Sequence, residues 1–127
     1  GPRDIENNKV VLVRRDLGEK TFLSKQDVLS AVPKLLEEIQ KNLFIQAKKF
    51  RDINTHFVST YDEFCSLMKT GGFVRCGWDG SSKTESKIKE DTKATIRCIP
   101  FDEKPEDLCC IFSGKPAKHE VIFAKAY

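Results

Sequence analysis

Five cysteines are the residues of this chain best suited to chemistry: Cys65, Cys76, Cys98, Cys109 and Cys110. A structural zinc site usually draws its ligands in pairs, about two to four residues apart within a loop. Cys76 has no cysteine downstream at that spacing, and Cys109 and Cys110 are adjacent, although ligands from scattered positions would also satisfy a metal. The spacing and the odd number therefore favour free thiols over disulfides, with Cys65 and Cys98 as small buried apolar residues.

Patterns typical of an active site are missing from the sequence. The glycines at 71–80 have the spacing of neither a P-loop nor a dinucleotide-binding fingerprint. No serine lies in a nucleophile elbow, and His56 and His119 are isolated. A catalytic cysteine–histidine pair is an alternative that no spacing singles out. We therefore expect no autonomous catalytic centre and no cofactor in this chain.

Three arginines, Arg3, Arg14 and Arg15, surround the first predicted strand and are candidates for RNA binding. The guanidinium group offers a planar fork of donors that suits phosphates and base edges. Alternation along a strand places Arg14 and Arg15 on opposite faces, so one RNA surface would meet at most one of them. Alternatively, the arginines form ion pairs with nearby carboxylates. Those carboxylates are Asp4, Asp16 and Glu19.

The composition is that of a globular protein, with 39% hydrophobic residues and a net charge of +3. This mild charge permits a phosphate-binding face without requiring one. The sequence has no run of ~20 apolar residues and no signal-peptide pattern. We expect a cytoplasmic protein with no membrane partner.

The first half of the chain predicts a hairpin and a long helix. Strands are expected at 9–15 and 20–23. A capping box at Ser24 opens a helix, Pro33 interrupts it, and a second helix continues to about Asn54. An apolar stripe on this second helix is expected to pack in a core. Its members are Leu36, Ile39, Leu43, Ala47 and Phe50.

The second half predicts an α+β fold with short, largely antiparallel strands. Capping boxes at Thr60 and Ser82 predict helices that end at Gly71-Gly72 and at about Asp91. The predicted strands are 73–76, 94–99, 108–112 and 120–124. The chain is thus divided into two predicted domains, 1–55 and 56–127. A hairpin and one helix do not build a core, so the first is interpreted as part of something larger.

Several segments carry a family resemblance. Residues 1–20 resemble the last hairpin of the anticodon-binding domain in class IIa aminoacyl-tRNA synthetases, and 36–44 resemble the helix that follows it in prolyl-tRNA synthetases. Residues 94–101, 113–118 and 123–127 resemble the C-terminal domain of the eukaryote-like, archaeal-type branch of that family.

The resemblance implies the C-terminal portion of a proline–tRNA ligase, with the end of an α/β anticodon-binding domain followed by the C-terminal domain. The parent would use ATP and magnesium to form prolyl-adenylate and then charge tRNA(Pro), as a homodimer. The chain itself would bind the anticodon through Arg3, Arg14 and Arg15, support the rest of the synthetase chain, and carry no catalytic residue. Tyr127 would be a structural or substrate-proximal group. The alternative is a stand-alone RNA- or protein-interaction module.

The sequence departs from the family at one place. Many relatives bind zinc in the last domain through a set of four cysteines. Cys76 and either Cys109 or Cys110 match half of that set, whereas Ser81 and Ser113 stand near the other two positions. A serine hydroxyl is a poor replacement for a thiolate. We expect a degenerate zinc site around Cys76, Ser81, Cys110 and Ser113 that binds no metal, with hydrophobic packing holding the loops.

Overall fold

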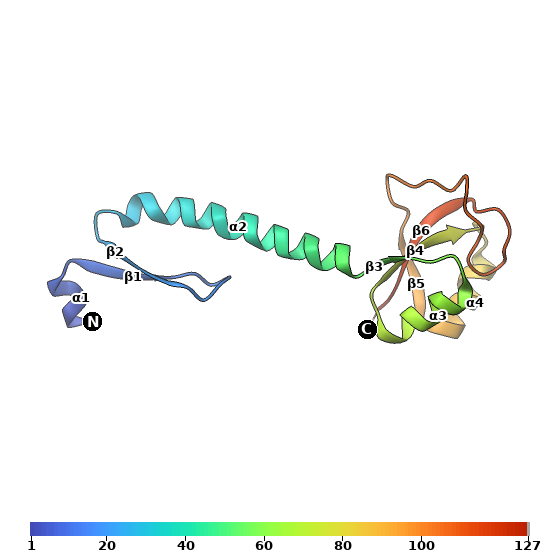
Figure 1. The fold of residues 1–127 in the computed structure, drawn as a ribbon, viewed down its shortest axis with the longest axis horizontal. Coiled ribbons are helices and arrows are strands. Elements are labelled where there is room, and N and C mark those ends of the chain that lie inside the picture. Colours follow the sequence, from blue (N-terminus) through green and yellow to red (C-terminus); the bar gives the residue numbers. More distant parts are fainter. Residues whose placement is uncertain (127) are drawn as a thin grey trace. The chain divides into compact units, whose positions relative to one another are not determined.

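The structure is a computed structural model, and it describes residues 1–126 (Figure 1). The chain divides into two compact units, Gly1–Phe50 and a second that begins at Arg51. The boundary predicted from the sequence falls after residue 55. The difference arises because a short strand, β3 (Thr55–Phe57), belongs to the sheet of the second unit.

The first unit is a hairpin and a helix. Its elements are α1 (Pro2–Glu6), β1 (Lys9–Val13), β2 (Lys20–Ser24) and α2 (Val28–Ile53), the last of which continues into the second unit. The strands pair antiparallel, with Val11 opposite Phe22. Gly18 takes a positive φ of 72° in the turn, which an L side chain adopts only with strain. No described residue of 1–50 is buried, so the apolar stripe of α2 lies on the surface of this unit.

The predicted break at Pro33 is wrong, because α2 runs without interruption through this proline. A proline inside a helix leaves the carbonyl of the fourth residue before it without a helical donor. That residue is Leu29, in the first turn of α2, and it is 87% exposed. Solvent can therefore hydrate the carbonyl of Leu29, and the helix continues through Pro33.

The second unit is a mixed four-stranded sheet with two helices. Its remaining elements are α3 (Tyr61–Thr70), β4 (Phe73–Trp78), α4 (Ser82–Thr92), β5 (Ala94–Cys98) and β6 (His119–Lys125). The strand order is β3-β4-β6-β5, with β3 parallel to β4 and the other pairs antiparallel. The predicted α+β class with short, largely antiparallel strands is confirmed.

The core of the second unit lies between the helices and one face of the sheet. Val74 pairs with Phe123, and both side chains are fully buried. They join Phe64 and Met68 from α3 and Ile88 from α4 in one cluster. Thr60 caps α3 as predicted, since its side chain accepts a hydrogen bond from the Glu63 amide at 3.4 Å. These helices fix the ends of the loops that form the candidate sites.

Three local predictions in the second unit are wrong. Residues 108–112 form no strand and contact other strands only through isolated bridges, one of them Gly77 with Cys110. The N-cap of α4 is Ser81 rather than Ser82. Cys98 is exposed rather than buried, because it lies at the end of β5 where a bulge interrupts the pairing with β6. None of the helices in the described chain is long and apolar enough to span a bilayer.

Candidate functional site

Arg14 is held within the first unit by carboxylates. Its Nε and Nη2 donate to the two carboxylate oxygens of Asp16 at 3.2 and 2.9 Å, and Nη1 donates to Glu38 at 3.0 Å. Asn42 on α2 also donates to Asp16, at 2.6 Å. The Asp16 side chain is only 1% exposed. This network ties the hairpin turn to α2.

The electrostatics agree with this structural role. The hydrogen bonds from Arg14, with that from Asn42, outweigh burial and lower the pKa of Asp16 to about 2. The hydrogen bond to Asp16 likewise raises the pKa of Arg14. The alternative that Arg14 pairs with Asp16 is therefore the arrangement found, and its donors already have protein partners. Arg14 is a weak candidate for RNA contact.

Arg3 and Arg15 differ from Arg14. Both are exposed, Arg3 on α1 and Arg15 just beyond the end of β1. Neither side chain forms a hydrogen bond or ion pair with another described residue. Exposed guanidinium groups of this kind keep their full set of donors for phosphates or base edges. Of the three arginines singled out in the sequence, these two are exposed and have no side-chain bond to another described residue.

Three of the four positions of the expected degenerate zinc site, Ser81, Cys110 and Ser113, lie around Asp79, a loop residue that the sequence does not single out. Asp79 follows β4, and its carboxylate accepts hydrogen bonds from the Ser81 amide at 3.0 Å, the Thr84 hydroxyl at 3.0 Å and the Ser113 hydroxyl at 2.7 Å. The Ser113 amide in turn donates to the Cys110 sulfur at 3.5 Å. The sequence Gly77-Trp78-Asp79-Gly80 predicts a turn, but no pattern near it indicates the hydrogen-bond partners of Asp79.

The residues present do not fit a zinc ion. Cys76 and Cys110 are 3% and 2% exposed, and burial, with the nearby Cys110, raises the pKa of Cys76 to about 12. Only these two of the four positions carry a thiol, and the serine hydroxyls at the other two are poor replacements for thiolates. The Ser113 hydroxyl donates to Asp79 instead of facing a metal. Within residues 1–126, no group of three or more His, Cys, Asp or Glu side chains is arranged to hold a metal ion.

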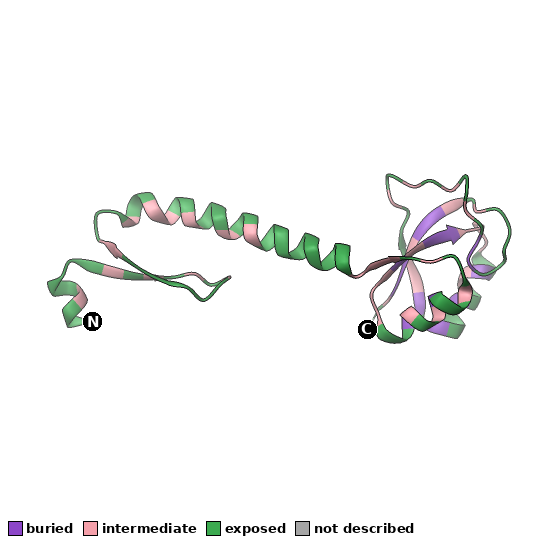
Figure 2. Ribbon diagram, viewed as in Figure 1, coloured by how far each residue is buried: buried purple, intermediate pink, exposed green. Residues whose placement is uncertain are grey.

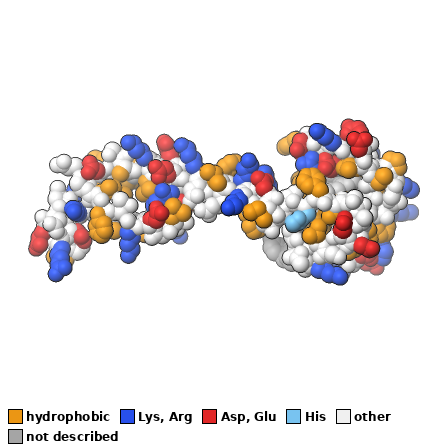
Figure 3. All heavy atoms as spheres, in the orientation of Figure 1, with side chains coloured by type: hydrophobic (Ala, Val, Ile, Leu, Met, Phe, Trp, Pro, Cys, Tyr) orange, Lys and Arg blue, Asp and Glu red, His pale blue; other side chains and the backbone are white. Residues whose placement is uncertain are grey.

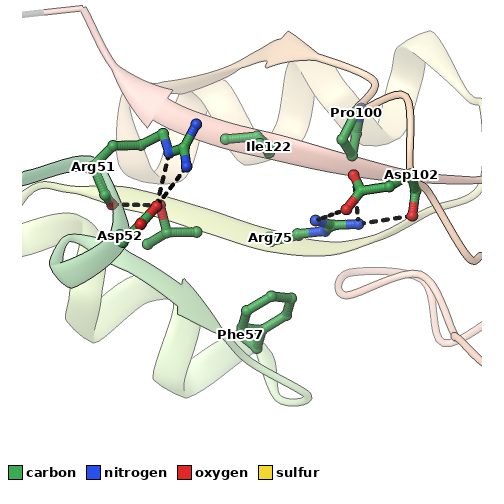
Figure 4. A pocket seen from close by; sticks show the side chains of 8 residues that line it. Arg51, Asp52, Phe57, Arg75, Pro100, Asp102 and Ile122 are labelled. Carbon is green, nitrogen blue, oxygen red and sulfur yellow. Dashed lines mark hydrogen bonds and ion pairs between the residues drawn. The ribbon is translucent and has the colours of Figure 1, made fainter. Parts of the chain in front are cut away.

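A hollow of about 410 Å³ opens on the face of the sheet that is turned away from α3 and α4. It lies between Arg75, Phe57 and Pro100 (Figure 4). Arg75 donates to both Glu120 oxygens at 2.8 Å and contacts Asp102 at 3.3 Å. Its guanidinium also lies 5.6 Å from the centre of the Phe57 ring. The charge of Arg75 is therefore compensated within the protein. A lone arginine in an apolar strand was the only signal of this cluster in the sequence.

The last residue singled out in the sequence, Tyr127, lies outside the described residues. The remaining cysteines and histidines form no shared site among the residues that the structure covers. His119 Nδ1 lies 3.3 Å from a Glu103 oxygen, and His56 lies in β3. The arrangement thus offers exposed arginines in the first unit and structural polar clusters in both units.

Known proteins resemble this chain along its whole length. It is 46% identical to a proline–tRNA ligase of Cytophaga hutchinsonii and 48% identical to one of Alkaliphilus oremlandii, each over 128 aligned residues. Both alignments cover all of this chain, but only 26% and 27% of the relatives. The chain therefore spans about a quarter of the length of the curated relatives it matches.

Solved structures give the same result. A prolyl-tRNA synthetase from Cryptosporidium parvum, in complex with L-proline and AMP, matches with a TM-score of 0.88 and 32% identity, covering all of this chain and 28% of that one. Fold and sequence together define a part of an aminoacyl-tRNA synthetase. A family model described as prolyl-tRNA synthetase, C-terminal, matches residues 61–127. The chain belongs to this prolyl-tRNA synthetase C-terminal family, and the resemblance noted in the sequence is confirmed.

Proposed function

We propose that this chain is the C-terminal part of a proline–tRNA ligase. The parent enzyme would activate proline with ATP and magnesium to give prolyl-adenylate, and would then transfer the prolyl group to tRNA(Pro). The observation that carries the proposal is the identity of 46% over the whole chain with a proline–tRNA ligase about four times as long. The chemistry is assigned to the part of the parent that lies outside these 127 residues.

Within the parent, residues 1–55 would complete the anticodon-binding domain with its linking helix, and 56–127 would form the C-terminal domain. The exposed Arg3 and Arg15 would contact anticodon bases or phosphates. Arg14, held by Asp16 and Glu38, would support the hairpin instead.

The other properties of the parent follow from this assignment. ATP use is supported by the similar synthetase of Cryptosporidium parvum, which was solved in complex with AMPPNP. Charging of tRNA takes place in the cytoplasm, so we place the parent there, and we propose a homodimer, as the class IIa resemblance implies. The chain itself would hold no cofactor.

The first test is tRNA charging by the full-length parent, with and without residues 55–127. We expect charging with proline, and a loss of charging on truncation. If the full-length protein charges no tRNA with proline, the ligase assignment is wrong and the alternative of an interaction module takes its place.

The second test addresses the arginines in the full-length parent. Arg3→Ala and Arg15→Ala should each raise the KM for tRNA about tenfold, the effect of losing roughly 1.4 kcal/mol of binding. Proline-dependent ATP–pyrophosphate exchange should be unchanged, because it needs no tRNA. Arg51→Ala is the matched control, since Arg51 is also exposed but pairs with its neighbour Asp52. An equal loss of exchange and charging would contradict the anticodon assignment.

A further inference from the structure

The loop after β4 and the turn before β6 meet at a single carboxylate. Asp79 lies just beyond β4, Thr84 lies in the first turn of α4, and Ser113 is 34 residues further along the chain than Asp79. All three hydrogen bonds to Asp79 are between 2.7 and 3.0 Å long. An ionised acceptor makes such bonds shorter and stronger than bonds between neutral groups.

Asp79 is ionised in this setting. Partial burial acts to raise its pKa, but the hydrogen bonds from Ser113, Ser81 and Thr84 outweigh burial and hold the pKa below its ordinary value. The charged acceptor of the cluster is therefore a carboxylate that already accepts three hydrogen bonds.

We infer that Asp79 replaces zinc as the cross-link of these two loops. A zinc ion bound by cysteines from two loops fixes the loops relative to each other, and the Asp79 carboxylate makes equivalent connections here with hydrogen bonds. Ser113 donates to this carboxylate through its hydroxyl and Ser81 through its backbone amide, so the Ser113 side chain is a member of the cluster and not merely a lost ligand. The expected hydrophobic packing of the loops is present as well, since Ile111 is 7% exposed and Phe112 packs edge-on against Tyr61 at 5.1 Å.

Gly77 shows how closely the two loops approach. A Cβ at this position would collide with the carbonyl oxygen of Cys109, and it would lie 2.9 Å from the Ala117 Cβ. The Ile111 amide donates to the Gly77 carbonyl at 3.0 Å, and the Lys118 amide donates to the Trp78 carbonyl at 2.8 Å. These backbone hydrogen bonds connect the segments on both sides of the turn at 113–116 to β4, and the hydrogen bond from Ser113 to Asp79 connects the turn itself.

This inference concerns the second unit alone and does not depend on the ligase assignment. The test compares Asp79→Asn with wild type in the full-length parent, by hydrogen exchange of the peptide 108–116 and by zinc analysis of the purified protein. We expect wild type to hold far less than one zinc per chain, and a chelator to leave the exchange of the peptide unchanged. Asp79→Asn should raise this exchange about tenfold or more, because the turn loses its charged acceptor.

Three comparisons distinguish a local cross-linking role of Asp79 from a general loss of stability of the second unit. Asp107→Asn removes an exposed carboxylate from the same segment and should leave the exchange at the wild-type rate. Ser113→Ala keeps Asp79 but removes the hydroxyl donor, and should raise the exchange by a smaller factor than Asp79→Asn. The peptide in α3, which does not contact Asp79, should exchange alike in all variants.

Stoichiometric zinc in wild type, faster exchange on chelation, or equal exchange in Asp79→Asn and Asp107→Asn would each overturn the inference.

Discussion

The two units of this chain maintain their folds by different means. Every buried residue among those described lies in the second unit (Figure 2), where Phe64, Phe123 and Met68 are fully buried. The first unit has none, and large apolar side chains such as Phe22 and Leu36 are 63% and 60% exposed. Apolar side chains accordingly reach the surface along the first unit (Figure 3). Regular secondary structure is thus no evidence of a core.

Both units also contain a carboxylate that accepts several hydrogen bonds. Asp16 joins the hairpin turn to α2 through Arg14 and Asn42, and Asp79 joins two loops through Ser113 and Thr84. In the second unit this cluster is added to a packed core. In the first unit, where no described residue is buried, it links the hairpin turn to the helix, so we expect the same chemistry to carry a larger share of the stability there.

The largest expected effect is the loss of unfolding free energy when a buried side chain of the second unit is removed, because only that unit has buried residues among those described. Phe123→Ala removes a fully buried ring that contacts Phe64 edge-on at 5.3 Å, and should cost about 3–5 kcal/mol of unfolding free energy. Phe22→Ala changes an exposed ring of the first unit and should cost about 0.5 kcal/mol or less. Denaturant unfolding followed by the fluorescence of Trp78 measures the first cost, and unfolding followed by the helical circular dichroism signal, to which α2 contributes, measures the second. Equal costs would contradict the contrast between the units.

A second prediction concerns local opening. In the 127-residue chain, amides of β1 and β2 should exchange roughly a hundredfold faster than those of β4 and β6, because only the latter lie over a packed core. Hydrogen exchange with mass spectrometry gives both rates in one sample. Similar protection in the two hairpin strands and in β4 would show that the first unit is stabilised independently of buried apolar area.

The third prediction tests the carboxylate of the first unit. Asp16→Asn should loosen the hairpin turn from α2 and raise the exchange of the β1 and β2 amides. Asp16 has a folded pKa of about 2, below its ordinary 3.8, so its contribution is present above about pH 4 and is lost as pH falls toward 2. Circular dichroism of wild type and variant should therefore differ at pH 5 and converge near pH 2. Glu37→Gln, at an exposed position of α2, is a control.

A much smaller effect than that of Phe123→Ala is expected at a surface hydrogen bond of the second unit. Tyr61→Phe removes the hydroxyl that donates to Asp91 at 3.0 Å but keeps the ring against Phe112. The cost should be about 0.5–1 kcal/mol, the net value of one exposed hydrogen bond. Thermal unfolding measures it, with Tyr61→Leu as the variant that also removes the aromatic packing. A larger cost for the hydroxyl than for the ring would show that polar contacts dominate in this unit too.

Local signals in the sequence predicted much of the fold. The hairpin, the end of α2 and the cap of α3 at Thr60 depend on residues within about one turn of each other, so the pattern indicates them directly. Pro33 misled the prediction, because its cost depends on whether the carbonyl of Leu29 is exposed.

Features that depend on distant partners could not be predicted. β3 is a strand only because it pairs with β4, and 108–112 is not a strand because only isolated bridges are available to it. The same holds for the sites. Arg75 and Glu120 are 45 residues apart, and Asp79 and Ser113 are 34 apart, so their contacts follow from the sheet topology rather than from spacing.

The position of β6 in the sheet has a consequence for the synthesis of this protein. β6 lies between β4 and β5, which have no direct pairing with each other. The ribosome makes β4 and β5 first; β4 can pair with β3, whereas β5 has no partner in the sheet until residues 119–125 are made. A nascent chain that has reached only the turn at 113–116 therefore leaves one edge of β4 and both edges of β5 unpaired. A nonsense codon in β6 would remove the strand that joins them.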